Sequence, residues 1–143
     1  MIVVDASIAA KWYLHEPGSD EAARLLTSNA ILIAPALIRI EVNAAIIRRY
    51  REGRLSKELA SDAAELWEAD LAVGSIRLVP NDGLIPMAKT IAFQLRHALQ
   101  DCLYLAAAIE TKAERLVTAD ATFHERAKKT YSQLELQHYA RPA

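Results

Sequence analysis

Two short apolar runs, each followed at once by an aspartate, constrain the fold of this chain more than any other feature. Residues 2–4 (Ile-Val-Val) precede Asp5, and residues 115–119 (Arg-Leu-Val-Thr-Ala) precede Asp120. Such runs are typical of buried strands, whereas a carboxylate is a poor choice for a core. Open α/β sheets place their ligand chemistry at the carboxyl ends of parallel strands. The pattern therefore predicts that Asp5 and Asp120 share one site at that edge of a sheet.

Strand and helix patterns alternate along the rest of the chain, which is typical of a parallel sheet covered by helices on both faces. Further strand patterns occupy residues 30–34, 74–79 and 134–139, the last as an edge strand. Helical patterns occupy residues 6–14, 19–29, 35–53, 56–72, 84–96, 101–109 and 121–129. Pro35 opens and Gly53 closes the third helix, and Asn81-Asp82-Gly83 indicates a turn. We therefore expect one α/β domain over residues 1–143, with right-handed crossovers and strand order 3-2-1-4-5.

Composition limits the class of protein. The chain has 143 residues, with 17 Lys and Arg against 18 Asp and Glu, so its net charge is −1. This charge excludes a uniformly basic nucleic-acid binder but allows a local basic patch. Cys102 is the single cysteine, which excludes an internal disulfide or a cysteine-based zinc site and favours the cytoplasm. We expect neither a signal peptide nor a membrane span, because Asp5 interrupts the first apolar run and no long uncharged run exists.

Two more carboxylates lie in helical patterns that begin near the same edge of the sheet. Glu41 has apolar neighbours on its helix face, where an acid costs stability unless it is paired or binds something. Arg48, two turns further on, offers an ion-pair partner. Asp101 begins an apolar helix, and helix capping explains an aspartate there as well as a ligand role does. All four acids are nevertheless expected at the carboxyl-end rim of the sheet.

Four carboxylates at one rim repel one another unless a cation joins them. With no cysteine or histidine expected nearby, hard oxygen ligands favour Mg²⁺, with Mn²⁺ as a substitute, over Zn²⁺. Acidic metal sites of this kind activate water for in-line attack on phosphodiesters. The four acids therefore predict a metal-dependent site for phosphodiester cleavage.

Four segments of the chain resemble the PIN domains, and among these the VapC toxins of bacterial and archaeal toxin–antitoxin pairs. They are Val-Val-Asp5-Ala-Ser7, Glu41 in its helix, Asp101-Cys-Leu-Tyr-Leu-Ala-Ala-Ala, and Leu-Val-Thr118-Ala-Asp120-Ala-Thr-Phe123. The resemblance covers nearly the whole chain in order. Two positions depart from the family pattern: Gln100 stands where relatives often have an aromatic residue, and Lys112-Ala113-Glu114 where they often have glycine.

The resemblance implies a PIN-like fold and a Mg²⁺-dependent endoribonuclease that acts as the toxin of a VapBC-type module. The expected catalytic and metal-binding residues, which match the family's acidic quartet, are Asp5, Glu41, Asp101 and Asp120. Ser7 and Thr118 match its supporting hydroxyls. RNA is then the substrate and a cognate antitoxin protein the partner. The alternatives are a PIN-domain RNA-processing nuclease without an antitoxin and a non-catalytic, partner-binding PIN module.

Basic and aromatic residues give weaker signals. The basic cluster at the end of the Glu41 helix consists of Arg48, Arg49, Arg51 and Arg54. Singly these arginines complement the helix dipole, and as a group they are suited to hold RNA phosphates. The histidines, which lack the spacing of a metal pair and are interpreted as structural or surface residues, are His15, His97, His124 and His138. Apolar helices, with Trp67 as a core or dimer contact, favour a homodimer.

Other function classes fit the residues less well. An aspartyl-phosphate enzyme of the haloacid-dehalogenase type needs an acid two residues after the first, where Ser7 stands. A receiver-like module needs paired acids at the first strand and a later lysine after a strand, and neither is evident. A degenerate PIN module is expected to lose acids, whereas this chain keeps all four. No Gly-rich loop is present to bind a nucleotide phosphate.

Overall fold

The structure, a computed structural model, describes residues 1–131 and 135–138. Its centre is a parallel sheet in the predicted order, β3-β2-β1-β4-β5. The strands are β1 (Ile2–Val4), β2 (Leu32–Pro35), β3 (Arg77–Val79), β4 (Arg115–Thr118) and β5 (Glu135–His138). Because Val4 of β1 pairs with Val117 of β4, the residues that follow these two strands meet at one edge of the sheet.

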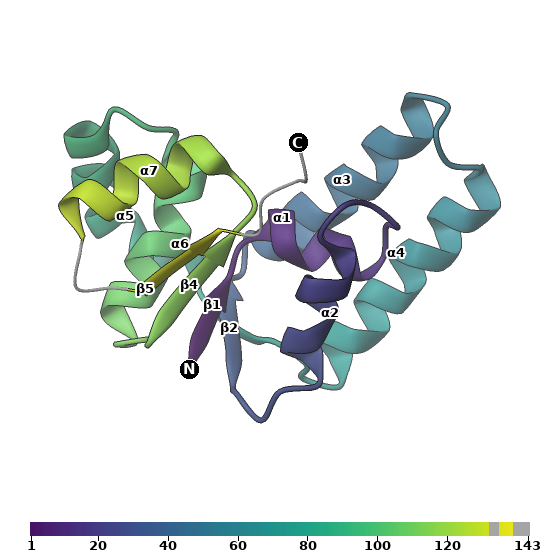
Figure 1. The fold of residues 1–143 in the computed structure, drawn as a ribbon, viewed down its shortest axis with the longest axis horizontal. Helices are drawn as coiled ribbons and strands as arrows, with labels where there is room; N and C mark the ends of the chain where they lie inside the picture. Colours follow the sequence, from purple (N-terminus) through teal and green to yellow (C-terminus); the bar gives the residue numbers. More distant parts are fainter. Residues whose placement is uncertain (132–134, 139–143) are drawn as a thin grey trace.

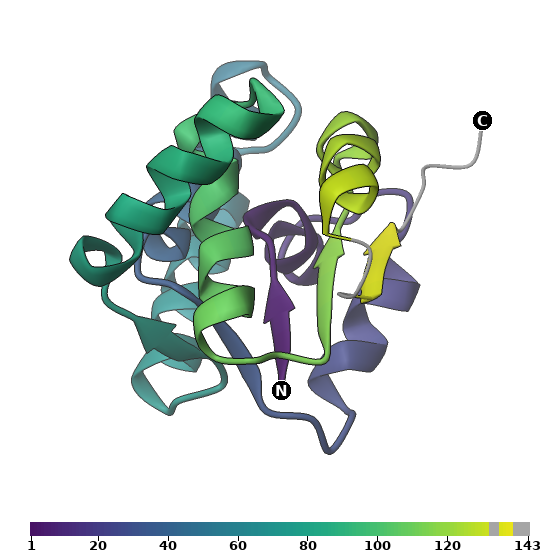
Figure 2. The same ribbon diagram turned by 90° about the vertical axis from the view of Figure 1, so that its left-hand side faces the viewer.

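The helices form two layers, one on each face of the sheet (Figure 1). The first layer consists of α1 (Ala6–Ala9), the 3₁₀ helix η1 (Ala10–Trp12), α2 (Ser19–Leu26), α3 (Ile38–Arg51) and α4 (Lys57–Ala72). The second consists of α5 (Asn81–Leu95), α6 (Leu99–Glu110) and α7 (Ala121–Thr130). Figure 2 looks onto the second layer and shows β1 and β4 side by side. This arrangement confirms the predicted α/β class with helices on both faces.

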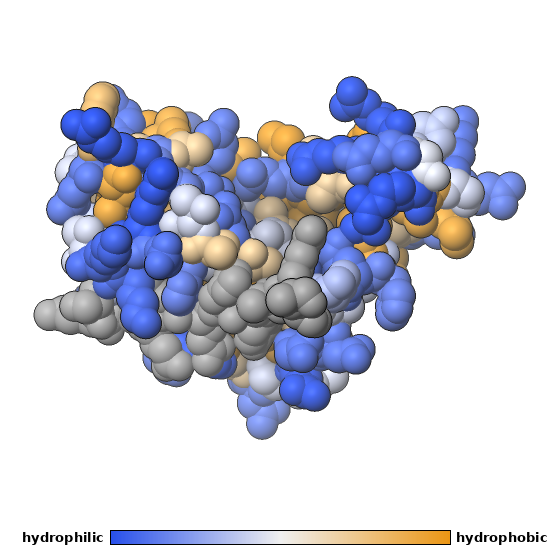
Figure 3. Space-filling model, turned by 45° about the horizontal axis from the view of Figure 1, so that its top comes forward, coloured by the Kyte–Doolittle hydropathy of each residue, from blue (hydrophilic) through white to orange (hydrophobic). Residues whose placement is uncertain are grey.

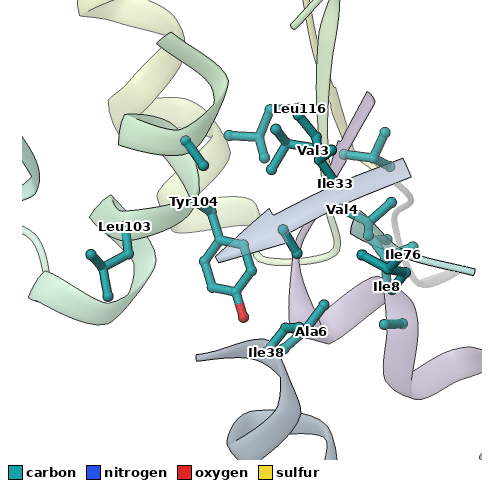
Figure 4. Close-up of a cluster of buried hydrophobic side chains, with 14 of the residues drawn as sticks. Val3, Val4, Ala6, Ile8, Ile33, Ile38, Ile76, Leu103, Tyr104 and Leu116 are labelled. Carbon is teal, nitrogen blue, oxygen red and sulfur yellow. The ribbon is translucent and has the colours of Figure 1, made fainter. Parts of the chain in front are cut away.

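The core lies on both faces of the sheet, and α6 is the helix with the longest buried run. All seven residues from Cys102 to Ala108 are buried, as the apolar sequence of this helix predicts. They pack against strand residues such as Val3, Ile33 and Leu116 (Figure 4). Trp67 of α4 is also completely buried and donates a hydrogen bond to the Arg39 carbonyl oxygen at 3.4 Å, so it is a core residue and not a dimer contact.

Two predicted helix starts are wrong, because a tertiary contact decides each boundary. Pro35 ends β2, where it pairs with Val79 of β3, and it does not open α3. Asn81-Asp82-Gly83 is the first turn of α5 and not a separate turn, and Asn81 Oδ1 accepts a hydrogen bond from the Leu37 N–H at 2.9 Å. The helix predicted over residues 6–14 is split into α1 and η1. Residues 134 and 139 of the predicted edge strand lie outside the described residues.

Within residues 1–131 and 135–138, every helix is too short or too polar to cross a bilayer.

Candidate active site

Asp5 lies directly after β1 and is buried, with 5% of its surface exposed. The Thr118 hydroxyl, at the end of neighbouring β4, donates a hydrogen bond to Asp5 Oδ2 at 2.7 Å. Burial is the main cause that raises the pKa of Asp5 from 3.8 to about 7. The charges of Asp101 and Glu41 raise this pKa further, and the Thr118 hydrogen bond lowers it. The ionised form of Asp5 is therefore costly unless a cation lies beside it.

Glu41 lies in the first turn of α3 and points into the same region as Asp5. The hydroxyl of Tyr104, a fully buried residue of α6, donates a hydrogen bond to Glu41 Oε1 at 2.6 Å. Figure 4 shows the Tyr104 ring among the core side chains, with its hydroxyl directed toward Ala6 of α1 and Ile38 of α3. Burial raises the pKa of Glu41, the charge of Asp101 adds to this rise, and the Tyr104 hydrogen bond opposes it. The core thus supplies the donor that orients this carboxylate.

A hydroxyl network joins the ends of β1 and β4. The Thr118 oxygen, which donates to Asp5, also accepts the Asp120 backbone N–H at 3.0 Å. Ser7 Oγ accepts the Ala119 backbone N–H at 3.0 Å. Asp120 Oδ1 caps α7 by accepting a backbone N–H of its first turn at 3.0 Å. Ser7 and Thr118 therefore hold the two acidic strand ends in a fixed relation.

Asp101 lies in the first turn of α6, two residues after the helix begins at Leu99. Sequence reasoning placed it as the first residue of that helix, but its carboxylate is directed to His97 and does not cap the helix. The distance from His97 Nε2 to Asp101 Oδ2 is 2.6 Å. One ligand atom each from His97, Asp101 and Asp120 lie within 4.8 Å of one another. No sequence signal identifies this contact, because His97 lies before α6 begins at Leu99 and so shares no helix periodicity with Asp101.

The position of His97 differs from the prediction. The spacing of the four histidines predicts structural or surface roles for all of them, and no histidine near the acids. The imidazole of His97 instead contacts the acidic site directly. Tyr104 is the second site residue that sequence reasoning did not single out. Its signal is its place three residues after Asp101, because a buried tyrosine hydroxyl requires a partner.

All four acids line one cavity of about 540 Å³ at the carboxyl-end edge of the sheet. Figure 3 shows this face of the molecule, which is hollowed between the two groups of helices. The basic side chains that line the rest of the cavity are Lys11, Arg48, Arg49 and Arg54. The cavity therefore has an acidic part at the strand ends and a more basic part toward the end of α3.

Glu16 ties two of the basic residues together. Lys11 Nζ donates to Glu16 Oε1 at 2.9 Å and to the Pro17 carbonyl oxygen at 2.7 Å, and its side chain is almost wholly buried. Arg49 forms an ion pair with the other carboxylate oxygen of Glu16. Sequence reasoning did not identify Lys11 or Glu16. Because Glu16 pairs with both Lys11 and Arg49, neither of these side chains neutralises the acids at the strand ends.

The acidic part of the cavity fits a hard divalent cation. Within the described part of the chain, no lysine or arginine is ion-paired with Asp5, Glu41, Asp101 or Asp120. Carboxylate oxygens are the ligands that Mg²⁺ and Mn²⁺ prefer. A cation there would also remove the cost that burial imposes on the ionised form of Asp5.

Comparison with protein families assigns the chain. The PIN domain family model matches residues 2–129, so the chain belongs to the PIN domain family. A search of curated protein sequences gives no significant match.

A solved structure shares the fold over the whole chain. The crystal structure of VapC20 from Mycobacterium tuberculosis, described as a sarcin–ricin loop cleaving toxin, superposes with a TM-score of 0.67. The match covers 99% of this chain and 100% of that one, at 17% sequence identity. The likeness supports the PIN fold at full length.

Proposed function

We propose that this PIN domain is a Mg²⁺-dependent endoribonuclease that acts as the toxin of a VapBC-type toxin–antitoxin module, with Mn²⁺ as a substitute ion. One observation carries the proposal: four carboxylates gather in one cavity, and the buried one, Asp5, has a pKa raised to about 7 mainly by burial. Such a group is suited to a cation and costly without one. Family membership and the likeness to the toxin VapC20 support the choice of RNA as substrate.

Each acid has a proposed role. Asp5 and Asp101 hold the cation directly, while Glu41 and Asp120 orient the attacking water or complete a second cation site. When bound, the cation neutralises the carboxylates and supplies Lewis-acid stabilisation of the charge that develops on the phosphate. Tyr104 keeps Glu41 directed into the cavity through its hydrogen bond.

The basic part of the cavity is proposed to hold the RNA backbone. Arg48 and Arg49 line the same cavity as the acids and lie on α3 beyond Glu41. Phosphate contacts of this kind position the nucleic acid and make binding depend on salt. The reacting phosphodiester then lies over the acids while neighbouring phosphates lie on the arginines.

Cleavage of defined RNAs tests the nuclease proposal. Purified protein is incubated with an unstructured RNA and with a sarcin–ricin loop hairpin, with Mg²⁺ or with chelator, and the ends produced are mapped. Wild type is expected to cut only with the cation. Asp5→Asn and Asp101→Asn, which remove charge without changing shape, are expected to lose at least about 100-fold in rate, or about 3 kcal/mol of transition-state stabilisation.

Asp62→Asn is the matched control, because Asp62 is an exposed acid of α4 outside the cavity. It is expected to cut at the wild-type rate. An Asp5→Asn protein that cuts RNA as fast as wild type would contradict the assignment of the nuclease to this cavity.

Growth of a bacterial host separates the toxin from the alternatives. Expression in the cytoplasm without a partner is expected to arrest growth, and Asp101→Asn is expected not to. Arrest by both proteins would indicate toxicity by binding, as in a non-catalytic PIN module. Cleavage in vitro without arrest would indicate an RNA-processing nuclease without an antitoxin. The proposed antitoxin has a basic or aromatic tail that covers the acidic cavity.

A homodimer is part of the proposal. Exposed apolar side chains lie on the α3–α4 hairpin, among them Ile40, Ile47, Leu59 and Leu66. Burying them between two copies would stabilise a dimer. Light scattering of the purified protein is expected to give twice the chain mass, and a monomer at all concentrations would contradict this part.

A further inference from the structure

His97 is held in one orientation by contacts on three sides. Its Nε2 lies 2.6 Å from Asp101 Oδ2, and Arg126 of α7 places one guanidinium nitrogen 3.1 Å from Nδ1. The ring also packs on Phe123, with the two ring centroids 5.1 Å apart. The imidazole side chain is 8% exposed. Arg126 is itself anchored, because the same nitrogen donates to the Arg96 carbonyl oxygen at 3.0 Å.

These contacts assign the proton on the ring of His97. A guanidinium has only N–H donors, so the contact with Arg126 requires Nδ1 to be the acceptor. In the neutral imidazole the other nitrogen, Nε2, then carries the hydrogen. Nε2–H donates this hydrogen to Asp101 Oδ2. Arg126 and Asp101 therefore select the same tautomer from opposite sides of the ring.

We infer that His97 is a positioning residue, which holds the Asp101 carboxylate ready for the cation and does not bind the cation itself. The inference rests on the proposed function, because it concerns the cation of that site. The closeness of His97, Asp101 and Asp120 suggests a mixed nitrogen and oxygen ligand set. The tautomer of His97 argues against His97 as a ligand. To bind a metal, Nε2 must offer its lone pair, so its proton would have to move to Nδ1. There the proton would face Arg126, which can only donate a hydrogen bond.

The effect on the cation follows from pre-organisation. The side chain of Asp101, in the first turn of α6, is 26% exposed, so its carboxylate can adopt several rotamers. The hydrogen bond from His97 selects one of them before the cation arrives, which lowers the ordering cost of binding. Partners of metal ligands at this distance typically contribute about 10–100-fold in metal affinity.

Titration of Mn²⁺, with the free ion followed by electron paramagnetic resonance, tests the inference without relying on activity. His97→Phe keeps a ring to pack on Phe123 but has no donor, and it is expected to weaken Mn²⁺ binding by about 10–100-fold. His97→Gln keeps an N–H donor near the position of Nε2 and is expected to restore affinity to within a few-fold of wild type. Unchanged affinity in His97→Phe, or a His97→Gln protein as weak as His97→Phe, would overturn the inference.

Nitrogen-15 NMR of the imidazole provides a spectroscopic readout. In the metal-free protein His97 is expected to show the Nε2–H tautomer, and saturating Mg²⁺ is expected to leave it unchanged. An Nδ1–H tautomer, or loss of the Nε2 hydrogen when Mg²⁺ binds, would overturn the inference. Failure of the proposed function looks different, because wild type itself would then neither bind Mn²⁺ nor cut RNA.

Discussion

The buried carboxylate of Asp5 is expected to contribute less stability to the metal-free protein at neutral pH than at low pH. Its pKa is raised from 3.8 to about 7, mainly by burial and further by the charges of Asp101 and Glu41. This rise corresponds to about 4 kcal/mol, at roughly 1.4 kcal/mol per pH unit. At a pH between about 4 and about 7, Asp5 holds a proton in the folded state that it has released in the unfolded state. The stability that Asp5 contributes is thus full below about pH 4 and is lost as pH rises through about 7.

Asp5→Asn removes the charge and keeps the shape of the side chain. The Asn side-chain oxygen can still accept the hydrogen bond from Thr118, but the new NH₂ group requires an acceptor of its own. The gain in folding stability from Asp5→Asn is therefore at most about 4 kcal/mol. For a domain of this size each kcal/mol corresponds to about 2–4 °C in Tm. Metal-free Asp5→Asn is therefore expected to melt several degrees above metal-free wild type near pH 8, and no higher than wild type near pH 4.

Thermal melts of both proteins, in chelator and in millimolar Mg²⁺, measure this effect. Mg²⁺ is expected to raise the Tm of wild type much more than that of Asp5→Asn, because only wild type keeps the full set of ligands. Asp62→Asn is the control and is expected to follow wild type throughout. The reasoning is refuted if chelated Asp5→Asn melts clearly below chelated wild type at pH 8 and Mg²⁺ shifts both proteins alike.

Three further substitutions test how the cavity is supported. Tyr104→Phe removes the hydroxyl that donates to Glu41. It is expected to lower stability by about 1–2 kcal/mol in urea unfolding and to slow RNA cleavage about tenfold. A wild-type cleavage rate would show that Glu41 needs no hydrogen-bond partner. Glu16→Gln leaves buried Lys11 without its anion and is expected to cost about 3 kcal/mol in urea unfolding. Lys11→Met keeps the apolar stem and leaves Glu16 paired with Arg49, so it is expected to cost less than half as much, and an equal cost would contradict the ion-pair argument.

Strand order and the convergence of the acids were predictable because both follow from short-range patterns. An apolar run that ends in an acid occurs at Asp5 and at Asp120, and parallel pairing of β1 with β4 brings their ends together. Helix periodicity similarly placed Glu41 and Asp101 near that edge. Geometry at this level needs only the topology of the sheet, and the cavity holds all four residues.

Features set by long-range contacts were not predictable. Pro35 extends β2 because β3 lies beside it, and Asn81 begins α5 while its side chain binds the Leu37 N–H. His97 lies in a link between helices, so no periodicity reports its contact with Asp101. Its tautomer depends on Arg126, which is 29 residues away in the sequence. Each of these features requires the folded chain to be known.

Anomalous diffraction from a crystal soaked in Mn²⁺ tests the central claim most directly, because it locates the ion without reference to activity. A Mn²⁺ peak is expected in the cavity, coordinated by carboxylate oxygens of Asp5 and Asp101, with His97 still hydrogen-bonded to Asp101 and outside the ligand set. A crystal that takes up Mn²⁺ elsewhere and leaves these carboxylates without it would contradict the claim that the four acids form a cation site.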